Sequence, residues 1–92
     1  MTFEDKKDYL NNIAINEEIS IYFPDGYEDA LIGYTVVGGS QTVGVYDYNK
    51  CIQLLVDRDR MSHEEAIEFF DYNTAGSCNY LGNESPIFIN KF

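Results

Sequence analysis

The hydrophobic pattern changes its period at Asp47, and this change constrains the fold more than any other feature of the sequence. Before it, residues 30–37 and 42–46 are rich in strand-forming side chains and flank a Gly-Gly-Ser turn at 38–40. After it, apolar residues recur at helical spacing over 51–56. The sequence therefore predicts a β-hairpin that leads into a helix, with Asp47 as the residue that caps the helix.

The clearest local motif marks the start of a second helix. The tetrapeptide 62–65 places Ser62 and Glu65 as in a capping box, where each side chain accepts a hydrogen bond from the backbone amide of the other residue. Apolar residues then recur at helical spacing as far as about Thr74. We expect the helix to stop at 75–76, because the glycine there suits a helix C-terminus.

The remaining elements follow from shorter signals. They are a helix over 3–12 capped by Thr2, a strand over 18–23 ended by a turn at 24–26, a loop over 79–85, and a last strand over 86–89 that begins with Pro86. Together the elements predict the α+β fold class. We expect a small single domain spanning 1–92, with an antiparallel sheet of three to four strands packed with two or three helices.

The charge of the chain is strongly acidic. Sixteen Asp and Glu against six Lys and Arg give a net charge of −10. This balance argues against direct binding to nucleic acid or to an anionic membrane, since both require a basic surface. Residues 8–49 carry seven acids and residues 61–90 carry five, and neither stretch contains a Lys or Arg. Acidic surfaces without basic residues are therefore expected on two parts of the domain.

Three of these acids share one stripe of the predicted second helix. Glu64 and Glu68 are four residues apart and Asp71 follows three residues later. Like charges at this spacing repel by a few tenths of a kcal/mol per pair, so folding gains nothing from the stripe. One interpretation is a solvated face that keeps the protein soluble. The other is a surface that imitates a phosphate backbone and occupies a basic groove on a nucleic-acid-binding protein.

The chain has eight tyrosines and no tryptophan. Tyr34 and Tyr46 fall on predicted strands and are expected in the core. Four others fall in turns or on polar faces among acids: Tyr27, Tyr48, Tyr72 and Tyr80. Tyrosine rings supply contact area while carboxylates meet Arg and Lys, so this combination suits a protein interface. The alternative is that these rings only cover the edges of a small core.

Three segments carry a resemblance to known proteins: 45–52, 61–70, and 73–76 followed by 82–89. This pattern, over roughly the last two-thirds of the chain, resembles a family of short, mostly uncharacterised proteins encoded by bacteriophages and prophages. The resemblance supplies no catalytic residues. It implies a phage context, in which small acidic proteins often block host defence enzymes, including CRISPR nucleases.

No pattern indicates catalysis, a cofactor or a metal. The acids from Asp57 are spaced as in a calcium loop, but Met61 and Ser62 stand where that loop needs an oxygen ligand and a glycine. His63 is the only histidine, and no second Cys or His motif accompanies it. The N-terminal segment is charged rather than apolar, so we expect a cytoplasmic protein in which Cys51 and Cys78 are free thiols.

The sequence thus predicts a phage-encoded acidic inhibitor that is not an enzyme. Its expected partner is a host nucleic-acid-processing defence protein with a basic groove, whose engagement of nucleic acid it would block by charge and shape mimicry. The alternative is a non-catalytic binding module, or a homodimer through an exposed strand edge such as the one begun by Pro86. The predicted partner-binding residues are Glu64, Glu68, Asp71, Asp25, Tyr27, Glu28, Asp29 and Tyr48.

Overall fold

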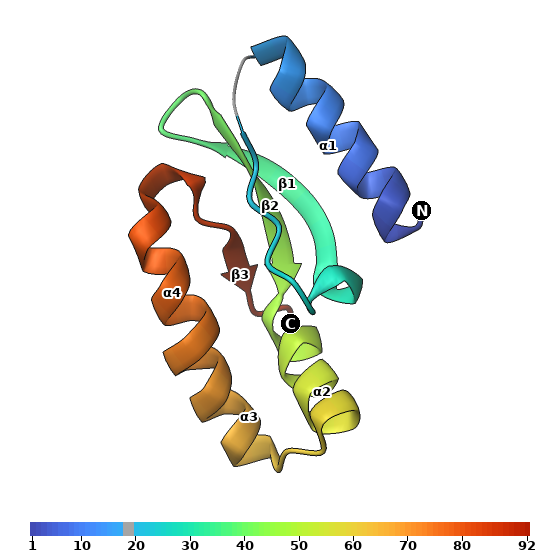
Figure 1. The fold of residues 1–92 in the computed structure, drawn as a ribbon, viewed down its shortest axis with the longest axis vertical. Coiled ribbons are helices and arrows are strands. Elements are labelled where there is room, and N and C mark those ends of the chain that lie inside the picture. Colours follow the sequence, from blue (N-terminus) through green and yellow to red (C-terminus); the bar gives the residue numbers. More distant parts are fainter. Residues whose placement is uncertain (18–19) are drawn as a thin grey trace.

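The computed structural model describes the backbone of residues 1–17 and 20–92, and the side chains of these residues except 15–17, 75, 77, 79, 80 and 83. The elements run in the order α1 (Phe3–Glu17), η1 (Glu28–Ala30), β1 (Leu31–Val37), β2 (Gln41–Asp47), α2 (Tyr48–Asp59), α3 (His63–Phe69), η2 (Phe70–Ala75), α4 (Gly76–Cys78), η3 (Asn79–Glu84) and β3 (Ile87–Ile89). Figure 1 shows the continuous helical column from α3 to η3 on one side of the sheet and α1 on the other. The α+β class is confirmed.

The sheet has the strand order β1-β2-β3 in the described part of the chain. β1 and β2 form the predicted antiparallel hairpin, whereas β3 pairs in parallel with β2. The sheet is therefore mixed, and the expectation of a wholly antiparallel sheet is corrected. The cause is the long helical connection between β2 and β3, because a crossover of this kind returns the chain in the same direction.

The helix starts agree closely with the sequence signals. The amide of Asp5 donates to Thr2 Oγ1 at 3.2 Å, and the Thr2 amide donates to Asp5 Oδ2 at 3.3 Å. The amide of Lys50 donates to Asp47 Oδ1 at 3.3 Å, which makes Asp47 the N-cap of α2 as predicted. α1 continues beyond residue 12 to Glu17, so only its end was misplaced.

The capping box at Ser62 is confirmed with both of its bonds. The Glu65 amide donates to Ser62 Oγ at 3.1 Å, and the Ser62 amide donates to Glu65 Oε1 at 3.2 Å. These bonds satisfy two of the amides that a helix start leaves without a backbone partner.

Replacing Ser62 by alanine removes the side chain that accepts from Glu65. We expect the variant to lose about 1 kcal/mol of unfolding free energy, measured by urea denaturation. Ser62→Thr, which keeps a hydroxyl at this position, serves as the control and should retain most of the stability. A Ser62→Ala protein as stable as the parent would show that the cap contributes nothing.

The helical backbone does not stop at 75–76, and this prediction is wrong. Residues Phe70–Ala75 form a π-helical segment, and the Gly76 amide donates to the carbonyl of Asp71, five residues back. Gly76 has a helical φ of −60°, so it closes the wide turn rather than ending the helix. The predicted loop over 79–85 is mostly the short helix η3, in which Gly82 turns the chain toward β3 with φ 60°.

The predicted strand over 18–23 is not found. Residues 18 and 19 lie outside those described, and residues 20–23 are extended without joining the sheet. Figure 1 shows this segment crossing the sheet. Its alternating apolar residues Ile21 and Phe23 pack on the core instead of pairing their backbone. The alternation of apolar and polar residues therefore predicted the extended backbone and the side chains that face the core. It did not predict that the backbone forms no strand hydrogen bonds with the sheet.

The core is centred on aromatic rings. Phe70 is fully buried, and the rings of Tyr27, Tyr48 and Phe88 meet it edge to face with centroids 4.9–5.4 Å away. Tyr46 is fully buried, as predicted, and stacks against Phe88. Tyr34 is 46% exposed, contrary to the prediction, because β1 lies at the edge of the sheet.

Candidate functional site

An acidic surface lies on α3 and the start of η2. Glu64, Glu68 and Asp71 are all exposed there, as predicted from their spacing, and Glu65 lies beside them. The ion pairs found among the described residues join Arg58 to Asp59 at 3.1 Å and Lys91 to Asp47 at 3.4 Å. Neither of them neutralises an acid of this surface.

Two exposed aromatic rings border the same acids. Phe69 is 38% exposed and Tyr72 is 87% exposed. Together with Met61, Glu65, Glu68 and Asn73 they line an open hollow of about 370 Å³. We call this surface the acidic face and define it by Glu64, Glu65, Glu68, Phe69, Asp71 and Tyr72. Tyr72 belongs to the tyrosines expected among acids, whereas Phe69 was not part of the predicted interface. The pair Phe69–Phe70 was the available signal, since neighbouring helical residues point in different directions and only one of them can face the core.

Asp71 is held by a second element. The hydroxyl of Tyr48, in the first turn of α2, donates to Asp71 Oδ1 at 3.2 Å. Burial raises the pKa of Tyr48, and the nearby Asp71 carboxylate raises it further. Tyr48 is half-buried, with its ring against Phe70, and presents its hydroxyl rather than its ring at the surface. Asp71 and Tyr48, which are both among the predicted partner-binding residues, therefore lie in contact, and part of this contact stabilises the fold.

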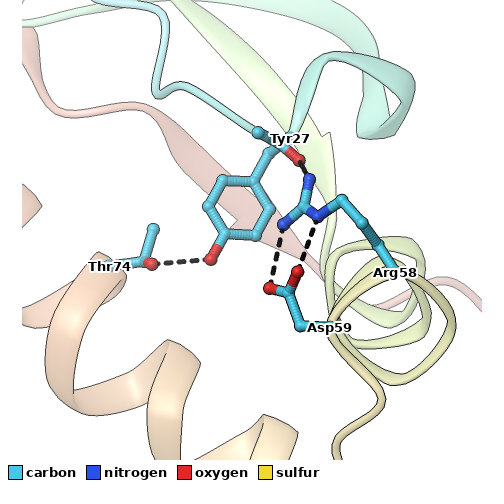
Figure 2. Close-up of polar contacts among 5 residues, drawn as sticks. Tyr27, Arg58, Asp59 and Thr74 are labelled. Atoms are coloured by element: carbon cyan, nitrogen blue, oxygen red, sulfur yellow. Dashed lines mark hydrogen bonds and ion pairs between the residues drawn. The ribbon is translucent and has the colours of Figure 1, made fainter.

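The second predicted group, around Tyr27, is a structural anchor rather than a free surface. The Tyr27 side chain is only 5% exposed, and its hydroxyl lies 2.8 Å from Thr74 Oγ1 (Figure 2). Burial raises the pKa of Tyr27. Arg58 Nη1 donates to the carbonyl of Gly26 at 2.7 Å, while its other nitrogens bond to Asp59. The expectation that Tyr27 supplies an exposed ring is therefore corrected, because the turn directs this ring into the core.

The acids next to Tyr27 lie apart from the acidic face. Asp25 and Asp29 are exposed and Glu28 is half-buried. In Figure 1, η1 and α3 lie on different sides of α2, so the two groups of acids do not form one continuous surface. The side chain of Tyr80, another tyrosine predicted near acids, lies outside those described.

The thiols are not suited to nucleophilic chemistry. Cys51 and Cys78 are free and buried, as expected for thiols that do not form a disulfide. Burial raises the pKa of Cys51 to about 12, and the Asp47 carboxylate adds to the effect. Burial also raises the pKa of Cys78. His63 is exposed at the start of α3, whereas Cys51 is fully buried, so the two do not form a nucleophile and base pair.

The raised pKa of Cys51 predicts a loss of stability in alkali. The folded protein keeps this thiol protonated up to about pH 12, whereas the unfolded chain releases the proton near the ordinary value of 9.0. The contribution of Cys51 is therefore complete below pH 9 and is lost as the pH rises toward 12. We expect the free energy of unfolding to fall over this range, less steeply in Cys51→Ala. Equal slopes for the two proteins would contradict the prediction. A thiol reagent should also modify Cys51 only after unfolding.

Further features limit the chemistry of the described residues. Within 1–17 and 20–92, no group of three or more His, Cys, Asp or Glu side chains is placed to hold a metal ion. No helix in this part of the chain is long and apolar enough to span a membrane.

Comparison of the chain with protein-family models, curated proteins and solved structures finds no match in any of the three. The acidic face is thus the candidate site, and it suits binding to a basic partner.

Proposed function

We propose that the protein is a non-catalytic inhibitor whose acidic face occupies the basic groove of a nucleic-acid-binding protein. The observation that carries the proposal is the combination, on α3 and η2, of two exposed aromatic rings with exposed acids that no ion pair among the described residues neutralises. Acids meet Arg and Lys of the partner, and the rings supply apolar area that excludes water from those pairs.

A surface that serves only solubility would not combine these residues. Glu64 lies in the first turn of α3, where an acid complements the helix dipole, but Glu68 lies beyond that turn and repels Glu64. Phe69 and Tyr72 expose apolar surface, which reduces solubility rather than increasing it. A binding surface accounts for both features, because the partner neutralises the acids and covers the rings.

The class of target follows from the sequence resemblance rather than from the geometry. The resemblance to phage and prophage proteins makes a host defence protein, such as a CRISPR nuclease or surveillance complex, the proposed partner. The protein would prevent nucleic acid from entering the groove without changing any covalent bond. This part of the proposal depends on the resemblance alone, whereas binding to a basic groove also has the support of the acidic face.

The test is capture of partners from bacterial lysate on the immobilised protein at low salt. We expect retention of a basic nucleic-acid-binding protein that duplex DNA or RNA displaces and that 1 M salt releases, because the screening length there is only ~3 Å. Purified partner should then lose nucleic-acid binding when the inhibitor is added. Partners that nucleic acid does not displace would contradict mimicry, and so would a complex that is stable at 1 M salt.

A further inference from the structure

A second surface, on the opposite side of the sheet from α3, is largely apolar. Five exposed side chains make up this surface, which we call the β1 patch. One comes from the N-terminus, one from α1 and three from β1: Met1, Tyr9, Ile32, Tyr34 and Val36. Tyr9 and Tyr34 stack with ring centroids 5.7 Å apart, and their hydroxyls lie 3.2 Å from each other. A hollow of about 310 Å³ opens between α1 and β1 beside them.

The charge around the β1 patch differs from that of the rest of the chain. Residues 30–46 contain no charged side chain, although the protein carries a net charge of −10. The lysine nearest the patch, Lys6, donates from Nζ to the carbonyl of Leu31 at 2.6 Å, so its ammonium group is already engaged by the strand. A basic partner would therefore be attracted to the acidic surfaces rather than to the patch.

We propose that the β1 patch binds a second copy of this chain in a two-fold symmetric dimer. Two strongly acidic molecules repel each other, and a strand without charged side chains is where they can meet without burying an unpaired carboxylate. A two-fold contact uses the same patch on both copies, so the exposed rings and aliphatic side chains of one copy meet those of the other.

The patch is large enough for a weak dimer. Two half-exposed tyrosines and three aliphatic side chains offer on the order of 500 Å² per copy, which lies near the lower limit for specific interfaces. β1 is also the longer of the two outer strands, with seven residues against three in β3. The structure therefore favours the β1 edge over the edge begun by Pro86, because long apolar edges without charge are the ones that associate.

Analytical ultracentrifugation between about 5 μM and 1 mM tests the proposal. We expect a monomer–dimer equilibrium with a Kd of about 10–500 μM, as for small transient interfaces. Raising the salt should strengthen this association, because it screens the repulsion between the acidic copies. Binding through the acidic face should weaken with salt, so the two proposals predict opposite trends and can fail independently.

Val36→Lys introduces a charge into the patch and should weaken the dimer at least tenfold. The variant reduces the net negative charge, so a general charge effect would strengthen association instead. Asn49→Lys is the matched control, since it makes the same charge change on an exposed residue of α2 that belongs neither to the patch nor to the acidic face. Circular dichroism checks that the variants fold, and Ile32→Lys provides a second variant in the patch. A protein that stays monomeric at 1 mM would overturn the proposal, and so would a dimer that Val36→Lys and Ile32→Lys leave unchanged.

Discussion

Replacing Glu64 and Glu68 together by lysine should weaken binding to the basic partner at least ~100-fold. A charged pair lost from the buried part of an interface costs ~2–5 kcal/mol, and both lysines would then face basic groups of the partner. The double variant is a cleaner test than one that also changes Asp71, because Asp71 accepts a hydrogen bond from Tyr48. Titration of the purified partner at low and high salt gives the affinities.

A matched control exists on α1. Glu4 and Asp8 are also four residues apart, are exposed, and begin in the first turn of a helix. Replacing both by lysine makes the same change of net charge and the same change at a helix start. We expect this control to keep nearly the full affinity. Equal losses of affinity in the two double variants would show that only the net charge matters. If neither variant lost affinity, the acidic face would serve only to keep the protein soluble.

Phe70→Ala should be the most destabilising single substitution in the aromatic core. The Phe70 ring is fully buried and meets three other rings, those of Tyr27, Tyr48 and Phe88. Removing such a ring costs ~3–5 kcal/mol, which is a large part of the ~5–15 kcal/mol that stabilises most domains. Urea denaturation should therefore show a much lower midpoint, and near-ultraviolet circular dichroism should weaken as the tyrosines lose their packing.

Phe69→Ala is the control for this substitution. Phe69 is the preceding residue and has the same side chain, but it is 38% exposed on the acidic face. We expect it to lose less than ~1 kcal/mol of unfolding free energy while it weakens partner binding. Equal destabilisation by both variants would contradict the assignment of Phe70 to the core and Phe69 to the surface.

Local signals account for the parts of the fold that were predicted correctly. The turn at 38–40 forms because Gly38 and Gly39 adopt φ values of 59° and 82°, which favour glycine. Ser62 and Asp47 cap helices through bonds to residues three positions later. Each of these features depends on a few adjacent residues, so it can be predicted from the local sequence alone.

The errors concern features that depend on tertiary contacts. The parallel pairing of β3 with β2 depends on where the helices return the chain. Segment 20–23 packs Ile21 and Phe23 on the core without joining either outer strand. Glycine at position 76 was interpreted as a stop, but the core contacts of the helical column continue through it to the buried Cys78. Such outcomes are decided by packing, which outweighs local preference.

The candidate site was also predicted only in part. The exposure of Glu64, Glu68 and Asp71 follows from helical spacing, and it is confirmed. The position of Tyr27 depends on a turn whose direction the sequence does not specify, so its ring was assigned to the wrong environment. Phe69 was missed because its exposure becomes clear only when the neighbouring Phe70 is seen to fill the core, whereas Tyr72 was expected on a polar face among acids and is 87% exposed.

The parallel pairing of β2 with β3 also has a consequence for the order of folding. Val45 pairs with Ile87, about forty residues further along the chain, whereas the β1–β2 hairpin joins neighbours. Hairpins form in roughly 1–10 μs. Pairing a distant strand is slower, because the intervening chain must lose conformational entropy before the strand makes any stabilising contact. β3 should therefore add to the sheet after the hairpin and the helices have formed. Until then β2 has an open edge, and a newly made chain is most prone to pair with a neighbouring chain during that interval.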